Sequence, residues 1–385
     1  MVAFCVGLAL ANVSLALPLH VLAQGKSPAL AGALLAALTA STAIGAACAP
    51  ALRGPFGDAR KLLVLALAFV AVGPLVLTAS GGVPYLAVGA TFVGLGIGLF
   101  WVASQILLGA LSGSPGSETG FQHHYALFTA GTVVGSVSTG LLASLLQHAG
   151  LSRATSLQMA MGLALLAAGI GMSAWRPAKT PQLQPRPSAP TLGLRLIVQG
   201  VNAQFSDLLL VAVMALFGQL VPIVLTGTFD VSAGAIGIVM AGVGAAKITG
   251  TYLAGGLLSI WGRGPTIIGM IATGSILCLL VTLVASTWAF LTLVITAELV
   301  LAGTWPLLVD ACQARVIVSE RAAFTAAWNI REYGVIALMT ASAGWLYGQS
   351  HAIAPMFGLG GVLLIGAVLA AAALMRRPVY TPACS

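Results

Sequence analysis

Apolar runs of about the length needed to cross a bilayer follow one another along almost the whole chain. A helix needs roughly 20 mostly apolar residues to span the hydrocarbon core. Only short segments containing Gly, Pro and charged residues interrupt the runs. With ends placed to within about 2–4 residues, we expect twelve helices: 2–22, 28–51, 61–80, 84–109, 124–146, 154–175, 204–226, 231–258, 264–286, 288–310, 322–347 and 353–375. The sequence therefore predicts an all-α, multi-pass membrane protein.

The composition excludes several other classes of protein. Charged residues are 6% of the chain and hydrophobic residues 59%, whereas a soluble domain carries about 25% charged residues. The net charge of +8 does not indicate nucleic acid as a partner, because the basic residues stand in short loops between apolar runs, where they set membrane orientation. We expect a monomer whose partners are the lipid bilayer and a small molecule.

The loops agree on one orientation. If the N-terminus is cytoplasmic, twelve of the sixteen Lys and Arg fall in cytoplasmic segments, and only Lys26 and Arg153 fall in outer loops. This is the bias that basic residues show toward the cytoplasm. The first run begins at residue 2 without a basic leader, which is typical of a span and not of a signal peptide. We expect both termini to be cytoplasmic and the membrane to be the plasma (inner) membrane of a bacterium.

A polar connector divides the predicted helices into six plus six. Residues 176–194 contain PAKTPQLQPRPSAPT, which lacks apolar periodicity and is typical of an extended linker. The segment FQHHYALFTAG at 121–131 aligns with FTAAWNIREYG at 324–334, which indicates two related bundles. We expect an N-terminal six-helix bundle at 1–175, a cytoplasmic linker at 176–194, and a pseudo-symmetric C-terminal six-helix bundle with a short cytoplasmic tail at 195–385.

Over essentially its whole length the chain resembles the major facilitator superfamily, in its twelve spans, repeated halves and long central linker. The loop between helices 2 and 3 of that family contains G-x-x-x-D-R-x-G-R-R. Here Gly57, Arg60 and Lys61 match its basic end, Arg53 takes the place of the acid, and Asp58 stands at a shifted position. The resemblance implies a gating role for Arg53, Asp58, Arg60 and Lys61, although the departure from the pattern leaves an ordinary basic loop as an alternative.

The predicted helix at 124–146 carries Gly131, Gly135 and Gly140. This spacing is similar to the glycine-rich motif of the family's exporters, G-x-x-x-G-P-x-x-G-G, with Ser136 in place of the proline. Small residues at this spacing let helix backbones approach closely. We expect these glycines to act in gating by packing at the interface of the two halves, and plain helix packing explains the same residues without export.

Four charged residues stand near the middle of predicted spans: Lys247, Glu298, Arg331 and Glu332. A charge at the bilayer centre costs roughly 2.5 kcal/mol or more, and such residues usually face a bundle interior. Adjacent helix residues diverge by about 100°, so Arg331 and Glu332 point in different directions. We expect Glu298 and Glu332 to carry the coupling proton and Lys247 and Arg331 to contact substrate. A static salt-bridge network is the alternative.

Other polar and aromatic residues complete the expected site. The candidate substrate contacts beside the charges are Asn12, Trp101, Gln105, Trp305, Trp328 and Asn329. Asp207 and Asp310 stand near the cytoplasmic ends of their helices, where we expect gating or structural charges. The pair His123–His124 is able to bind a metal, but no carboxylate is close in sequence. We therefore expect no metal and no cofactor.

The chain contains no GxxxxGK[ST] motif and no paired catalytic acids, so we expect neither an ATP-driven pump nor an enzyme. The function we expect is secondary active transport by alternating access of the two halves: proton-coupled export of a small organic or drug-like molecule. Uptake of an organic anion onto Lys247 or Arg331 is one alternative. A non-transporting membrane sensor or assembly factor on the same fold is another. Metal export requires His123 and His124 to reach the cavity.

Overall fold

The structure is a computed structural model, and it describes residues 1–56, 59–79, 82–111, 117–152, 155–157, 159, 162, 201–313 and 321–376. Every regular element in these residues is a helix, and nine helical stretches among them are long and apolar enough to cross a membrane. The predicted fold class, an all-α multi-pass membrane protein, is confirmed.

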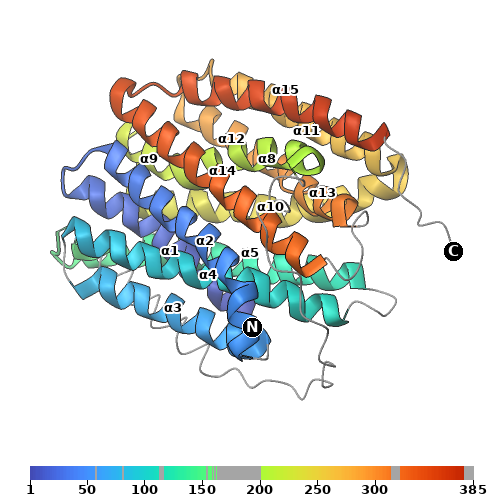
Figure 1. Cartoon of the computed structure of the whole chain (residues 1–385). Helices are drawn as coiled ribbons and strands as arrows, with labels where there is room; N and C mark the ends of the chain where they lie inside the picture. Colours follow the sequence, from blue (N-terminus) through green and yellow to red (C-terminus); the bar gives the residue numbers. More distant parts are fainter. Residues whose placement is uncertain are drawn as a thin grey trace, which may run out of the picture.

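The first half forms one bundle, drawn in blue to teal in Figure 1. Its helices are α1 (Val2–Ala23), α2 (Pro28–Phe56), α3 (Ala59–Ala79), α4 (Val83–Leu111) and α5 (Ser117–His148). They follow the apolar runs, because in a bilayer a backbone can satisfy its hydrogen bonds only internally. Most of the predicted span 154–175 and the whole linker at 176–194 lie outside the described residues, so the boundary between the halves stays a prediction.

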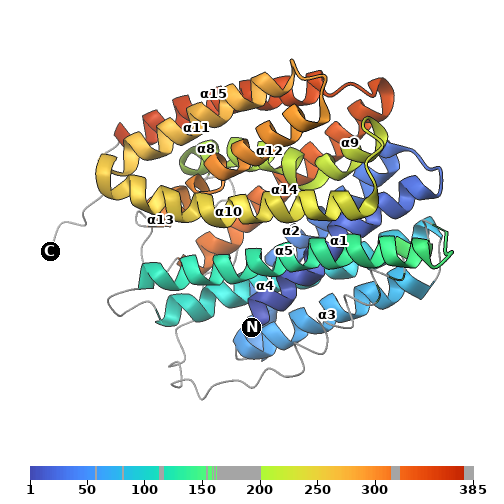
Figure 2. The same cartoon turned by 180° about the vertical axis from the view of Figure 1, so that it is seen from behind.

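The second half forms the other bundle, drawn in green to red in Figures 1 and 2. Its helices are α8 (Val201–Ala215), η1 (Leu216–Leu220), α9 (Val221–Gly227), α10 (Ala233–Trp261), α11 (Arg263–Val281), α12 (Thr287–Leu301), α13 (Thr304–Gln313), α14 (Arg321–Ser350) and α15 (Ala354–Arg376).

Two of the predicted spans are not single regular helices. The span expected at 204–226 contains a π-helical segment, η1, between α8 and α9. The span expected at 288–310 is interrupted at residues 302–303, between α12 and α13. The Thr304 hydroxyl donates to the Leu301 carbonyl at 2.6 Å across that interruption. Hydropathy does not register such breaks, because side-chain and π-type hydrogen bonds satisfy the backbone without adding polar residues.

The two halves meet along two seams of small residues, α2 against α14 and α5 against α10. A Cβ atom on Gly32 would lie 2.8 Å from the Gly344 Cα, and one on Gly140 would lie 2.9 Å from the Gly237 Cα. No real Cβ tolerates such distances, so glycine is required for the backbones to come this close. Both seams lie toward the end of the bundle that we expect to face outward.

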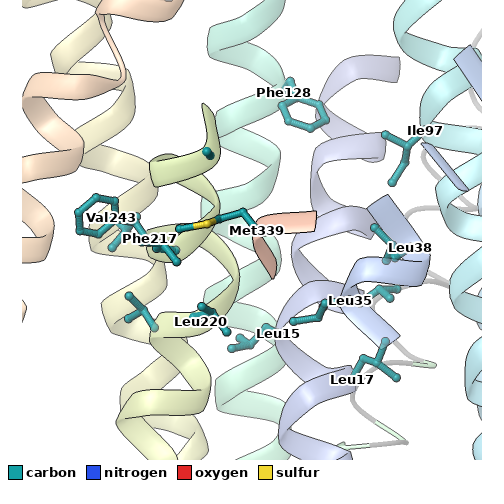
Figure 3. Packing of buried hydrophobic residues seen from close by; sticks show 14 of the residues in the cluster. Leu15, Leu17, Leu35, Leu38, Ile97, Phe128, Phe217, Leu220, Val243 and Met339 are labelled. Carbon is teal, nitrogen blue, oxygen red and sulfur yellow. The ribbon is translucent and has the colours of Figure 1, made fainter. Parts of the chain in front are cut away.

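Apolar side chains from both halves form one continuous core. Figure 3 shows part of it, with Leu15 and Leu35 from the first half and Phe217, Leu220 and Met339 from the second. Within the second half, Phe217 also packs on Phe357 with ring centroids 5.5 Å apart.

Candidate functional site

A central cavity of about 260 Å³ lies between the two halves. Helices α1, α2, α4 and α5 line it on one side, and α8, η1, α9, α10, α13 and α14 line it on the other. Most of the lining is aliphatic or aromatic. Among the described residues, the charged side chains on its wall are Lys247 and Glu332.

Lys247 is held by an acid behind the wall. Its Nζ lies 3.3 Å from Oε1 of Glu298, which comes from α12 and is fully buried, whereas 21% of the Lys247 side chain is exposed. Helices α10 and α12 pack directly on each other, which places the two charges at the same depth. The lysine therefore meets the cavity with its charge already balanced.

Glu332 presents a different environment. The indole Nε1 of Trp305, on α13, donates to Glu332 Oε1 at 2.9 Å. Glu332 is 8% exposed and lines the cavity. Within the described part of the chain, no Lys or Arg lies within ion-pair distance of its carboxylate. The wall therefore carries a carboxylate bound by a neutral donor.

A second polar cluster lies beside the cavity, at the start of α8. Arg331 donates from Nε to Oε1 of Gln204, and Gln204 donates from Nε2 to Oδ2 of Asp207 at 3.1 Å. The same Nε2 also donates to the Trp328 carbonyl at 3.3 Å. One buried amide thus joins a cation to an anion, using its carbonyl for the first and its amino group for the second.

Two contacts cross the cavity between the halves. The rings of Tyr125 on α5 and Trp305 on α13 have centroids 5.3 Å apart. Asn329 Nδ2 on α14 donates to Gln105 Oε1 on α4 at 3.4 Å. Trp305 therefore touches both the opposite half and Glu332.

The structure brings together part of the expected site. The expected residues on the cavity wall are Trp101, Gln105, Lys247, Trp305, Asn329 and Glu332. Those not on the wall are Asn12, Glu298, Trp328 and Arg331. Asn12 is fully buried in α1, and neither of its amide atoms has a hydrogen-bond partner among the described residues.

Helix geometry explains how α14 divides its residues. Asn329 and Glu332 are three apart, share one face and line the cavity. Trp328 and Arg331 are also three apart and share the neighbouring face, where Trp328 packs on Phe324 with ring centroids 5.6 Å apart. The expected divergence of Arg331 and Glu332 is present, but the expectation that Arg331 and Trp328 stand on the substrate wall does not match their placement.

The predicted gating residues fall into separate places. A Cβ on Gly131 would lie 2.0 Å from the Phe4 carbonyl oxygen, and one on Gly135 would lie 2.6 Å from the Leu8 carbonyl oxygen. These two glycines therefore pack α5 on α1 inside the first half, and only Gly140 lies on the seam between halves, because the three do not share one face.

Of the charged gating candidates, the structure describes the side chains of Lys61 and Asp207. Lys61 is exposed near the start of α3, and Asp207 is buried in the cluster with Gln204. The side chains of Arg53, Asp58, Arg60 and Asp310 lie outside the described residues. A gating role for any of them stays a prediction.

The histidine pair does not reach the cavity. The His124 ring stacks on Phe100 with centroids 5.6 Å apart, and His123 is exposed. Neither lines the cavity wall, and the described residues hold no group of three or more His, Cys, Asp or Glu suited to a metal ion. The condition that metal export requires is therefore not met by this geometry.

Sequence reasoning missed several neutral residues of the site. Tyr125, Tyr333 and Gln219 line the cavity, and Thr340 donates to Gln219 Oε1 at 2.7 Å. Gln204 was not predicted as a site residue, although it stands three residues before Asp207 on the same helix face. Neutral polar residues are common in membrane helices, so the sequence offers no contrast that marks them.

No protein-family model matches the chain, and no curated protein matches its sequence. Solved structures match nearly its full length. The fucose:proton symporter of E. coli has a TM-score of 0.68 at 12% identity, covering 97% of each chain. A bacterial homologue of the human lysosomal transporter Spinster has a TM-score of 0.69 at 14% identity, covering 99% of this chain and 98% of that one. The nucleoside transporter NupG has a TM-score of 0.69 at 14% identity, covering 97% and 98%.

These similarities define a fold of two helical bundles. It is the fold of major facilitator superfamily transporters, as the sequence motifs indicated. At such identities the likeness establishes the architecture alone.

Proposed function

We propose that this protein is a secondary transporter that exports a small organic molecule in exchange for protons by alternating access. The observation that carries the proposal is Glu332, a carboxylate on the wall of a cavity shared by both halves, bound by the Trp305 indole and by no cation among the described residues. A carboxyl in such surroundings is able to exist both as a neutral acid and as an anion, which a proton carrier requires.

The surrounding contacts suggest how the proton is coupled to movement. The Trp305 indole donates to the Glu332 carboxylate and its ring meets Tyr125 of the other half. Protonation of Glu332 weakens the indole hydrogen bond, because a charged acceptor binds a donor more strongly than a neutral one. That change frees Trp305 to leave Tyr125, so the proton state favours one arrangement of the halves over the other.

Glu298 has a different proposed role. Its contact with Lys247 at 3.3 Å favours the charged form of both groups. It therefore holds Lys247 in place, whereas Glu332 carries the proton. Export is the direction that the glycine pattern at 131–140 favours, because it resembles the motif of exporters and Gly140 lies on a seam between the halves.

Uptake of an organic anion remains the second candidate, and Lys247 is the observation that favours it. This lysine lines the cavity and is 21% exposed. Two features disfavour the candidate: Glu298 already balances the charge of Lys247, and Arg331 is directed toward Gln204 and away from the wall.

Proton movement in proteoliposomes tests the proposal. A pH-sensitive dye inside the vesicles reports proton flux when a panel of cationic, neutral and anionic compounds is added to wild type, Glu332→Gln and Glu332→Asp. We expect at least one compound to drive flux in wild type, Glu332→Gln to abolish it, and Glu332→Asp to keep part of it. Gln retains an acceptor for the Trp305 indole, so folding is preserved, which size-exclusion chromatography checks.

Two outcomes contradict the proposal. Equal proton-linked flux in wild type and in Glu332→Gln removes Glu332 as the proton site. Silence of folded wild type across the whole panel favours a sensor or assembly role. Lys247→Met combined with Glu298→Leu is the matched control, because it removes both charges of the neighbouring pair and leaves Glu332 untouched.

A further inference from the structure

Among the residues that the structure describes, the charges around the cavity do not balance. In the interior of the described spans the acids are Asp207, Glu298 and Glu332, and the bases are Lys247 and Arg331. Lys247 contacts Glu298 directly, and Arg331 is joined to Asp207 through Gln204. Glu332 is the remaining charge, and it is the one that faces the cavity.

The titratable groups around Glu332 do not alter this balance. Asp207 on α8 and Tyr125 on α5 lie within electrostatic reach of it, and Tyr333 follows it on α14. Lys247, on α10, faces the same cavity but is paired. The other ionisable neighbours are Asp207, Tyr125 and Tyr333, which are an acid and two phenols, and Arg331, which is bound to Gln204 and does not line the cavity.

The rest of the wall is rich in aromatic rings. Trp101 and Phe128 have ring centroids 4.8 Å apart, and Tyr125 and Trp305 lie 5.3 Å apart on the side of Glu332. Electron-rich ring faces attract cations, with indole the strongest. The hydrogen bond from Trp305 to Glu332 holds such a ring against the carboxylate that lacks a counter-ion among the described residues. An anionic group and an aromatic surface are therefore presented together.

The polarity and size of the cavity restrict the class of ligand further. Its volume of about 260 Å³ lies just below the roughly 300–1,000 Å³ of small-molecule pockets. The lining also includes Met214, Met240 and Val243, and methionine adapts to flat rings through its polarizable sulfur. A small ligand with one charged nitrogen and one ring matches these surfaces.

We infer that the cavity binds a monovalent organic cation carrying an aromatic ring, with its charged nitrogen at Glu332. This inference rests on the proposed function and names its substrate class. The cation and the proton occupy the same carboxylate in turn: the carboxylic acid releases its proton, and the carboxylate then pairs with the cation. One positive charge replaces another, so a complete exchange cycle moves no net charge across the membrane.

Binding to the purified full-length protein tests the inference directly. N-methylquinolinium serves as the cationic probe, quinoline at alkaline pH as its neutral counterpart of similar shape, and naphthalene sulfonate as an anionic one. Calorimetric titration in buffers of different ionisation enthalpy counts the protons released. We expect the cation to bind most tightly, with release of a proton at pH values where Glu332 starts protonated. We expect Glu332→Gln to weaken its binding by about ten- to hundredfold, as loss of a charged partner does.

Quinoline or naphthalene sulfonate binding as tightly as the cation overturns the inference, and so does cation affinity that is unchanged in folded Glu332→Gln. Absence of cation binding to folded wild type also overturns it. Glu332→Asp is the matched variant, because it keeps the carboxylate and is expected to keep cation preference.

Flux measurements separate failure of this inference from failure of the proposed function. In proteoliposomes, exchange of N-methylquinolinium for protons is expected to respond to a pH gradient and not to a potassium diffusion potential set with valinomycin. Proton-linked flux of a neutral or anionic compound alone overturns the cation assignment and leaves proton-coupled transport standing. Absence of any proton-linked flux contradicts both the cation assignment and proton-coupled transport.

Discussion

The two halves of the cavity wall differ in what they contribute. The first half presents neutral side chains such as Trp101, Gln105 and Tyr125, from helices that run without interruption. The second half presents Lys247 and Glu332, and two of its spans are interrupted beside them. A regular apolar bundle suits a surface that only has to accommodate a ligand. A charged site in a membrane needs additional partners, which irregular backbone and buried amides help to supply.

The largest effect on stability is expected where a buried charge loses its partner. Glu298→Gln leaves Lys247 without a counter-ion, and breaking such a buried pair costs about 3–5 kcal/mol. We expect a large fall in the thermal unfolding temperature of the detergent-solubilised protein. The double variant Lys247→Met with Glu298→Leu is expected to recover most of it. If Glu298→Gln alone is as stable as wild type, the pair is not a structural element of the second half.

The second largest loss of stability is expected where two helices pack closely inside the first half. Gly131→Ala places a Cβ against the Phe4 carbonyl oxygen, and relieving such overpacking costs about 1–3 kcal/mol. Gly218→Ala in η1 is the matched control, since a Cβ there meets no atom within 4 Å, and its stability is expected to change by less than about 0.5 kcal/mol. Thermal unfolding of both variants measures the contrast. Equal losses would mean that the first half is not held by the α1–α5 contact.

Loss of the amide that joins Arg331 to Asp207 is expected to lower stability by a similar amount. Gln204→Leu removes the hydrogen bonds from Gln204 to Arg331 and to Asp207. Losing these partners is expected to lower the free energy of unfolding by about 1–3 kcal/mol. Gln204→Glu, which keeps an acceptor for Arg331, is expected to lose less at low pH, where the new carboxyl is neutral. Unfolding midpoints across pH provide the measurement, and identical losses for Leu and Glu would refute the bridging role.

The smallest effect is expected at Asn12. Its amide is fully buried without a hydrogen-bond partner among the described residues and does not line the cavity. Asn12→Leu removes an unsatisfied polar group, so we expect stability to be unchanged or raised by about 1 kcal/mol. Transport of any identified compound is expected to be unaffected. A loss of flux in the folded variant would show that the first half contributes a polar contact of its own.

Much of this arrangement follows from the sequence, for reasons particular residues make clear. Hydropathy located the helices that the structure describes, and the 100° turn between neighbours separated Arg331 from Glu332. It did not say which of the two faces the cavity, because that depends on how α14 packs against α8 and α2. For the same reason the sequence did not show that Asn329, and not its neighbour Trp328, lines the cavity wall.

Residues that carry no charge were the hardest to foresee. Gln204 and Tyr125 are ordinary in a membrane helix, and only the folded chain brings one between Arg331 and Asp207 and the other against Trp305. The interruptions at η1 and at residues 302–303 were missed for a related reason. The pattern of apolar residues stays the same when the backbone hydrogen bonding shifts by one residue.

The π-helical segment η1 sets the angular register of the seventh span. A π-helical turn behaves as an α-helix with one residue inserted, and each residue turns the helix by about 100°. The faces of α8 and α9 are therefore out of phase with each other by that amount. Removing a single residue from Leu216–Leu220 would restore a regular helix and rotate Pro222 and everything after it relative to Gln204 and Asp207. The insertion lets one span direct its first part toward the buried charges and its second part toward the other half, two tasks that a regular helix cannot perform with the same sequence.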